Sequence, residues 1–214
     1  MNVVLLGIPG SGKGTQADFL KNRLGLRTIN TGDLLREAMK KKTELGKRTK
    51  EFMEKGDLVP DKILLDFIEE KIKEQKRSSG FVLDGFPRTL KQAEDLDLIF
   101  QKLGTELDCA IKLDISEKRA RKRLEGRLVC PFCGAFFNLE TNPPKDDILC
   151  DICGNKLVRR FDDNKETIAT RIQVYREKTK PVENYYKKQG KLEIINGDAE
   201  ADVVSRRIIS VLGK

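Results

Sequence analysis

Glycines and one lysine near the N-terminus have the spacing of a phosphate-binding loop. In the stretch GIPGSGKGT, Gly7, Gly12 and Lys13 match the pattern G-x4-G-K directly after an apolar run. Glycines let backbone N–H groups converge on phosphate oxygens, a following helix N-terminus adds positive potential, and the lysine supplies a mobile charge. The common form is altered, because Gly14 follows the lysine and the hydroxyl comes one residue later, at Thr15. The alternative is an ordinary glycine-rich turn; the lysine and its context favour phosphate binding.

Four cysteines have the spacing of a metal site. Cys130 and Cys133 are followed, after sixteen residues, by Cys150 and Cys153. Four thiolates at this spacing are typical of tetrahedral zinc, and they leave no coordination position open, so such a site is structural. Disulfides are an alternative that a reducing cytoplasm disfavours, and an iron–sulfur cluster accepts the same four ligands. We predict structural zinc.

Residue types that are missing or scarce narrow the chemistry further. The sequence contains no histidine, which excludes an imidazole base and any histidine-containing metal site. The fifth cysteine, Cys109, lies in the apolar stretch DCAIKLDI, where we expect it to pack as a small hydrophobic residue. The formal net charge of +8 suits a polyanionic partner, either nucleotide phosphate or nucleic acid.

Alternating apolar and amphipathic stretches predict the elements that position these residues. Continuous apolar runs indicate buried strands, and periodic runs indicate helices. Strands are expected at 2–8, 80–85, 108–115 and 191–196, and helices after the glycine loop up to Leu24 and at 31–42, 43–56, 60–75, 89–103, 116–126, 163–190 and 200–212. The helix at 163–190 is expected to bend before Pro181. Strands that alternate with helices predict an α/β fold with a parallel sheet covered on both faces.

The sequence gives no sign of a membrane or secreted protein. It has no apolar run long enough to span a bilayer and no charged and apolar leader of the secretory type. We therefore expect a cytoplasmic protein that does not bind membranes, and a monomer by default.

Four motifs together resemble those of the adenylate kinase family of nucleoside monophosphate kinases. GIPGSGKGT, NTGDLLR, LDGFPRT and RRFDDN occur in the expected order over nearly the whole chain, and DGFPRT is the most specific. The resemblance implies a phosphate-loop fold and reversible phosphoryl transfer from Mg²⁺-ATP to AMP, giving two ADP. It also implies a core at 1–29, 60–125 and 164–214 with two mobile inserts, an AMP-binding arm at 30–59 and a zinc-stapled lid at 126–163.

The resemblance assigns the phosphates to basic side chains. Phosphoryl transfer asks mainly for positioning and charge stabilisation, and the AMP phosphate is itself an acceptor anion, so no strong base is required. Arginine suits this task because its planar guanidinium binds phosphate oxygens in pairs. By similarity, the catalytic set is Lys13 in the loop, Arg36 and Arg88 at the AMP phosphate, Arg123 and Arg127 at ATP phosphates, and Arg160 and Arg171 over the transferring group.

The remaining contacts are also carried over from the family. The implied ATP-binding positions are Gly10, Ser11, Gly12, Lys13, Gly14, Thr15, Arg127, Phe136, Phe137 and the backbone near Ala199. The implied AMP-binding positions are Thr31, Arg36, the main chain at Asp57, Leu58 and Val59, then Gly85, Phe86, Pro87, Arg88, Gln92, Arg160 and Arg171. Gln92 is implied to read the adenine edge, and Asp84 to orient water on Mg²⁺. Many relatives have a Tyr-His or similar pair where this chain has two phenylalanines. Polar side-chain contacts to ATP are therefore not expected at these two positions, and stacking or main-chain contact remains.

The lid insert needs the metal for its stability. It has few large apolar side chains and cannot bury much of a core alone, so a metal cross-link would substitute. Closure of the lid would expel water, bring Arg127 and Arg160 inward and suppress hydrolysis of ATP. Gly126 and the stretch FDDN are the expected hinge ends.

Several alternatives stay open at this point. We expect Arg119 and Arg121, inside KRARKR, to be exposed cations that solubilise a helix. Arg123 and Arg127 share a helix face unless the helix ends at Gly126 first. The bond before Pro87 is cis, turning Arg88 toward the cleft, or it is trans.

Two other functions compete with adenylate kinase activity. One is a related kinase that uses UMP or CMP as acceptor or GTP as donor; the long lid, Gln92 and Thr31 favour AMP. The other is a basic zinc-ribbon protein that binds nucleic acid and uses ATP as a switch. Basic residues scattered among acidic ones and only 13 aromatic residues disfavour it, so we expect no nucleic-acid partner.

Overall fold

A parallel sheet forms the centre of the computed structural model, which describes residues 1–74, 79–146 and 148–213. Among these residues the main sheet has five strands in the order β2-β3-β1-β4-β7, and each neighbouring pair is parallel. The strands are β1 (Asn2–Leu6), β2 (Arg27–Asn30), β3 (Phe81–Asp84), β4 (Cys109–Asp114) and β7 (Leu192–Asn196). The predicted α/β fold is confirmed.

Two details of the sheet differ from the sequence prediction. Strand β2 was not predicted, because its four residues bury only Ile29 fully and form an edge that exists through pairing with β3. Strand β1 is shorter than predicted and ends at Leu6, because Gly7 leaves the extended conformation with a φ of 139°. Only Gly adopts such a φ readily, so the glycine that starts the loop also ends the strand.

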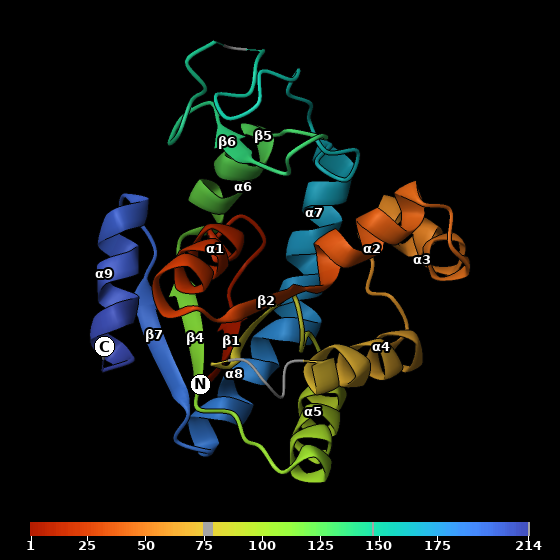
Figure 1. The fold of residues 1–214 in the computed structure, drawn as a ribbon, viewed down its shortest axis with the longest axis vertical. Helices are drawn as coiled ribbons and strands as arrows, with labels where there is room; N and C mark the ends of the chain where they lie inside the picture. The colour runs from red at the N-terminus through yellow and green to blue at the C-terminus, as the bar shows by residue number, and fades with distance from the viewer. Residues whose placement is uncertain (75–78, 147, 214) are drawn as a thin grey trace.

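Helices cover both faces of the sheet, as predicted (Figure 1). On one face, α1 (Lys13–Leu24) and α9 (Ala201–Val211) pack on alternate strand residues such as Val3 and Leu5. On the other face, α4 (Asp61–Glu74), α5 (Leu90–Leu103) and α8 (Lys180–Lys188) pack on the intervening residues. Cys109 belongs to the first of these cores, and burial raises the pKa of its thiol to about 11. Its predicted role as a packing residue is confirmed.

Helix ends coincide with capping residues that the sequence displays. Gly25 and Gly56 end α1 and α3 (Glu44–Lys55) in the left-handed conformation. Asn30 accepts from the Asp33 N–H at 3.0 Å and begins α2 (Thr31–Lys40), and Ser116 begins α6 (Glu117–Glu125) in the same way. The final residue of the predicted helix 60–75 lies outside the described residues.

The predicted helix at 163–190 has three parts. They are α7 (Lys165–Val174), a π-helical turn at Tyr175–Thr179, and α8 with Pro181 in its first turn. Proline has no N–H for the helix ladder, and the N–H of Lys180 bonds to the carbonyl of Tyr175, five residues back. The predicted bend before Pro181 thus takes the form of a wider turn.

A second, smaller sheet lies beside the four clustered cysteines. Strands β5 (Arg127–Val129) and β6 (Phe136–Asn138) pair antiparallel, and only a small cluster that includes Leu128, Phe137 and Leu157 packs beside Cys130 and Cys150. In Figure 1 this sheet lies at the end of the molecule above α6 and α7, while α2 and α3 project at one side. Within the described ranges, no helix combines the length and apolar character needed to cross a membrane.

Candidate active site

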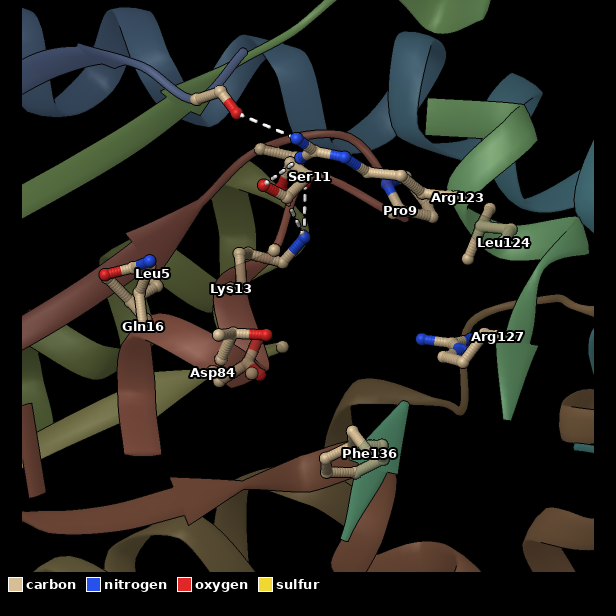
Figure 2. Close-up of a pocket in the computed structure, with 18 of the residues that line it drawn as sticks. Leu5, Pro9, Ser11, Lys13, Gln16, Asp84, Arg123, Leu124, Arg127 and Phe136 are labelled. Carbon is tan, nitrogen blue, oxygen red and sulfur yellow. Dashed lines mark hydrogen bonds between the residues drawn. The ribbon is translucent and has the colours of Figure 1, made fainter. Parts of the chain in front are cut away.

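A cavity of about 980 Å³ opens at the carboxyl ends of the central strands. The register pairs Leu5 of β1 with Asp84 of β3, and Asn30 of β2 with the same aspartate. Open α/β sheets bind ligands at this edge, because loops from neighbouring strands meet there. The walls come from the glycine loop, α2, the β5–β6 sheet, α7 and residues 197–204. Figure 2 shows Lys13 and Asp84 on one side of the cavity and Arg127 on the other.

The glycine loop has the shape of an anion site. Gly10 and Gly12 have φ values of 89° and 97°, and a Cβ on Gly10 would lie 2.4 Å from the carbonyl oxygen of Ala120. Within the described structure, no side chain caps the N-terminus of α1, and its first turn has no acidic residue. The N–H groups at this end therefore add positive potential to the cavity.

Lys13 and Asp84 carry opposite charges beside the loop, and each influences the pKa of the other. The Lys13 Nζ donates to the carbonyl oxygens of Gly7 at 2.7 Å and Ile8 at 3.2 Å. Burial, reinforced by nearby arginines, lowers the pKa of Lys13 to about 8, although Asp84 opposes the change. Burial raises the pKa of Asp84, and Asn30 Nδ2 donates to its Oδ2 at 2.8 Å. One oxygen of the Asp84 carboxylate is thus fixed by the protein.

Arginines from the small sheet and from α7 share one carboxylate. Arg127 binds Asp163 through two hydrogen bonds of 2.7 and 2.6 Å, and Arg171 donates to the same carboxylate at 2.8 Å. Burial lowers the pKa of Arg171, and Arg127 lowers it further. This pairing draws two guanidinium groups to one side of the cavity.

A second network joins α2 to the segment after the small sheet. Arg36 binds Asp33 at 2.6 Å and Asp162 at 3.3 Å, and Arg160 binds Asp33 at 3.1 Å. Burial tends to raise the pKa of Asp162, but Arg36 and the other guanidinium groups outweigh it and the net pKa is lowered. Burial lowers the pKa of Arg160 to about 9, so this arginine stays protonated at neutral pH. Its guanidinium also stacks on the ring of Phe136, 4.8 Å from the ring centre.

Arg88 is fixed through its own main chain. The Phe86–Pro87 bond is cis, which settles the alternative that the sequence left open, and Arg88 lines the cavity. The Nε of Arg88 donates to the carbonyl oxygen of Gly85 at 2.7 Å. Its backbone N–H donates to Gln92 Oε1 at 2.6 Å, and its carbonyl oxygen accepts from Thr179 Oγ1 at 2.9 Å. Burial, with Arg171 as the next cause, lowers the pKa of Arg88 to about 10.

Helix α6 supplies Arg123, settles one alternative that the sequence left open and corrects one expectation. Arg123 donates to the carbonyl oxygens of Ser11 at 3.5 Å and Gly197 at 3.2 Å, so it bridges the glycine loop and the 197–204 segment. The helix ends before Gly126, and Arg127 lies on a strand, so the two arginines do not share a helix face. Arg119 was expected to be a merely solubilising cation, which is wrong, because it lines the cavity and pairs with Asp198 at 3.2 Å. Arg121 has the expected surface position and pairs with Glu117.

Most of the predicted site residues line this one cavity, but five AMP-site positions are not part of its wall in the described structure. The five are Thr31, Asp57, Val59, Phe86 and Gln92. Thr31 lies one layer behind and donates to the Gly85 carbonyl oxygen at 2.9 Å, and Gln92 is completely buried. Tyr175 and Thr179 were not predicted, although both line the cavity. Only the proline two residues after Thr179 marks this turn in the sequence.

The four clustered cysteines are arranged for one metal ion. Their Sγ atoms all lie within 4.8 Å of one another, with 3.4 Å between Cys130 and Cys153 and 3.6 Å between Cys133 and Cys150. All four are free thiols, and these distances exceed the roughly 2.05 Å of a disulfide. A tetrahedral zinc with Zn–S distances of about 2.3 Å places its sulfurs just under about 4 Å apart, so the donor set fits. The same four thiolates remain compatible with iron.

Comparison with known proteins covers the whole chain. The sequence profile of the family described as "Adenylate kinase" matches residues 5–191. An adenylate kinase of Kosmotoga olearia is 48% identical over 212 residues, which is 99% of each chain. Adenylate kinases of Archaeoglobus fulgidus and Caldicellulosiruptor bescii are 44% and 41% identical, each over 100% of this chain and 99% of the relative. The similarity therefore extends over the segments that form the cavity and the segment that contains the four cysteines.

Proposed function

Since this chain belongs to the adenylate kinase family and is an enzyme that converts ATP and AMP into two ADP, we propose that its cavity holds ATP over the glycine loop and AMP beside α2. The observation that carries this assignment is the convergence on one cavity of Lys13 and the six arginines predicted as catalytic, each from a different element or loop of the fold. Those six are Arg36, Arg88, Arg123, Arg127, Arg160 and Arg171. Two nucleotides bring several negative charges into a small volume, which such a set can stabilise.

The ATP phosphates bind to the loop. The uncapped N-terminus of α1 and Lys13 face the cavity, and Arg123 bridges this loop to the segment that contains Ala199. The triphosphate exchanges its contacts with water for backbone N–H groups and Lys13, while the adenine lies near residues 197–204. Phe136 supports Arg160 by stacking, so its contribution to ATP binding runs through the arginine.

The AMP phosphate binds between α2 and the loop after β3. Arg36 and Arg88 reach this part of the cavity, and the buried position of Gln92 places its amide beneath the surface. An adenine base reaches that amide only after neighbouring side chains separate. Thr31, Phe86 and Val59 likewise act from the layer behind the cavity wall, whereas Leu58 lines the cavity.

In the structure, carboxylates of the protein bind the arginines that we assign to the nucleotide phosphates. Arg36, Arg127, Arg160 and Arg171 each bind Asp33, Asp162 or Asp163 at the cavity edge. A phosphate matches the guanidinium better than a carboxylate does, because it carries more charge and more oxygens. Transfer then proceeds with charge stabilised on both sides of the moving group, and no residue is needed as a strong base.

The residues near Asp84 fit a magnesium ion. Hard cations take carboxylate and water oxygens, and the carboxylate of Asp84 is buried at the cavity with one oxygen held by Asn30. When bound there, Mg²⁺ would neutralise part of the negative charge on the phosphates. We assign Asp84 the orientation of its water ligands, with Thr15 lining the same cavity.

The cysteine cluster holds zinc, and this zinc stabilises the lid rather than reacting. The hydrophobic cluster of the small sheet is minor, and four thiolates occupy every position of a tetrahedral ion. We place the lid at 126–163, the AMP-binding arm at 30–59 and the core in the remaining residues. Contacts between arm and lid, such as Arg160 with Asp33 and Lys40 with the Pro131 carbonyl oxygen, support closure over bound nucleotides. We also infer a monomer in the cytoplasm, where the thiols stay reduced.

The assignment of the nucleotides is tested by mixing the purified protein with Mg-ATP and, separately, AMP, UMP, CMP or GMP, and quantifying the diphosphates. We expect rapid ADP formation that depends on AMP, with little hydrolysis of ATP when AMP is withheld. If a folded, zinc-loaded sample transfers phosphate to no acceptor, the assignment is wrong. If it hydrolyses ATP equally fast without AMP, the closure over bound nucleotides is wrong.

A further inference from the structure

The amide of Gln92 is held in one orientation by two partners of opposite type. Its Oε1 accepts from the backbone N–H of Arg88 at 2.6 Å, and its Nε2 donates to Oδ1 of Asp61 at 2.5 Å. A backbone N–H only donates, and a carboxylate only accepts. The two ends of the amide are therefore distinguished by the protein itself. A rotation by 180° would break both hydrogen bonds and place like partners against each other.

Asp61 lies where it can link the acceptor site to this amide. It begins α4, two residues after Val59, and its second oxygen accepts from the Thr89 hydroxyl at 3.5 Å. Thr89 in turn caps α5 by accepting from the Gln92 N–H at 3.1 Å. One carboxylate thus joins the segment at 57–59 to the first turn of α5.

Among the residues that the structure describes, the fixed amide has one donor and one acceptor position without a partner. A primary amide has two N–H donors and two acceptor positions on its oxygen, and one of each is occupied here. What remains is one acceptor beside one donor, in a known order. That pair complements a base edge with an amino group next to an unprotonated ring nitrogen, as in adenine and cytosine. Guanine, hypoxanthine and uracil present the reverse pair, a carbonyl oxygen next to a ring N–H.

We propose that Asp61 is a specificity-determining positioning residue, which fixes the Gln92 amide so that the acceptor site takes 6-amino bases and rejects 6-keto bases. The proposal rests on the assignment of Gln92 to the AMP base given above. Asp61 itself touches no substrate in this account. It acts by making the rotated amide, which a keto base would require, costly in a buried place.

The test compares AMP with IMP, two acceptors of equal size that differ at position 6. Asp61→Asn keeps the shape of the side chain, but the new amide can either donate to or accept from Gln92. Residue 61 then no longer opposes the rotated Gln92 amide, and only the backbone N–H of Arg88 still does. We expect the ratio of kcat/KM for AMP to that for IMP to fall by about tenfold, the effect of one buried hydrogen bond. The KM for ATP should stay unchanged. The same ratio measured as Kd values by calorimetry supplies a readout that is independent of turnover.

Three further variants make the outcome decisive. Asp66→Asn changes an exposed acid on the same helix and should leave the AMP/IMP ratio as in the wild type. Asp61→Ser supplies a residue that favours the start of a helix, but its side chain is too short to reach Gln92. It should lower the AMP/IMP ratio as Asp61→Asn does, and it replaces Asp61→Asn in the test if that variant does not fold. Gln92→Ala should remove the preference. Folded Asp61 variants with a wild-type AMP/IMP ratio would overturn the proposal, and so would an undiminished preference in Gln92→Ala.

The wild type alone offers an independent check with smaller bases. CMP presents an amino group and UMP a carbonyl at the corresponding place, so we expect CMP to be the better of the two pyrimidine acceptors. Asp61→Asn should narrow that difference, and equal use of CMP and UMP by the wild type would contradict the orientation. Failure of the wild type to phosphorylate AMP would instead overturn the assignment of the nucleotides, so the two failures are distinguishable.

Discussion

Single residues in the cavity carry charges that burial disfavours. Lys13, Arg88, Arg160 and Arg171 all have lowered pKa values, and burial is the first cause for each. Such charges persist in a protein when partners or ligands compensate them. Here carboxylates compensate some of them, and we propose that nucleotide phosphates compensate the rest. A group whose pKa is shifted in a cleft is a sign of function, and this cavity holds several.

Arg88 should be essential for transfer and dispensable for folding. In Arg88→Ala we expect kcat to fall by about 10²- to 10³-fold, as when one buried donor to a reacting anion is removed. The backbone contacts of residue 88 to Gln92 and Thr179 do not depend on its side chain, so the thermal midpoint should change little. Steady-state kinetics and a thermal melt check both parts. Arg121→Ala on the surface of α6 is the matched control, and a wild-type rate in Arg88→Ala would remove this arginine from the catalytic set.

Lys13 should give ATP capture a pH dependence above neutrality. Its pKa is lowered from 10.5 to about 8, so the free enzyme loses this charge as the pH rises through about 8. We expect kcat/KM for ATP to fall above that pH, while kcat persists to higher pH because bound phosphate stabilises the charged lysine. A profile from pH 6.5 to 9.5 checks this, with circular dichroism at each pH as the control. A kcat/KM that stays level to the highest pH would contradict the expectation.

The same shift has a definite sign for stability. Between about pH 8 and pH 10.5 the unfolded chain binds a proton that the folded chain lacks at Lys13, so this group favours folding more as the pH rises. Below about pH 8 the cost of the buried charge is fully present. The free-energy cost of burying Lys13 is therefore smallest at alkaline pH, where the loop has lost the charge that binds phosphate.

At the scale of elements, the π-helical turn between α7 and α8 positions the site. The turn places Tyr175 and Thr179 in the cavity wall, and the Thr179 hydroxyl holds the Arg88 carbonyl oxygen at 2.9 Å. Behind it, the Tyr175 hydroxyl donates to Glu183 at 2.6 Å, and Lys112 of β4 pairs with the same carboxylate at 2.9 Å. Wide turns of this kind recur at functional sites because they redirect side chains within a helix.

Loss of the Thr179 hydroxyl should loosen Arg88 without removing it. In Thr179→Val, a change that keeps the side-chain shape, we expect kcat to fall by about tenfold with little change in the KM for ATP. The control is Thr170→Val, whose hydroxyl bonds to the Glu166 carbonyl oxygen on the exposed face of α7. Equal rates for the two variants would show that the turn does not position Arg88.

At the scale of the whole molecule, α2 and the segment that contains the small sheet meet at the cavity through charged side chains. Asp33 of α2 binds Arg160, Arg36 binds Asp162, and the ammonium of Lys40 lies 3.4 Å from the Pro131 carbonyl oxygen beside the cysteines. Partly exposed ion pairs contribute little stability each, so they can exchange for contacts to nucleotides. A stable insert that moves as one body suits this exchange better than one that unfolds.

Removal of the metal should therefore affect stability before activity. Chelation of zinc should lower the thermal midpoint by about 10 °C, because the site is linked to folding of the small sheet. Turnover at 25 °C should change by less than about twofold, because a four-cysteine site has no position for substrate. Differential scanning calorimetry and coupled assays on the same samples check this, with zinc added back as the control. If Cys150→Ser kept full stability but lost phosphoryl transfer, the metal site would be catalytic and not structural.

Local patterns in the sequence already indicated much of this protein. The glycine loop, the two cysteine pairs and the helix caps act within a few residues, so residue type and spacing suffice to recognise them. The strong apolar runs located four of the five main strands. The resemblance to one family supplied the arginines, and the comparisons with known proteins confirmed that family.

Contacts between distant segments required the tertiary structure. Strand β2 exists because β3 offers it a partner, and Arg119 faces the cavity because of where α6 lies. The link from Asp61 to Gln92 joins residues 31 positions apart, and the pairs of Arg36 with Asp162 and Arg160 with Asp33 span more than 120. The sequence determined which groups are available, because local chemistry fixes turns, caps and ligands. The fold decided which of them meet, because that depends on how the sheet brings separate loops to one edge.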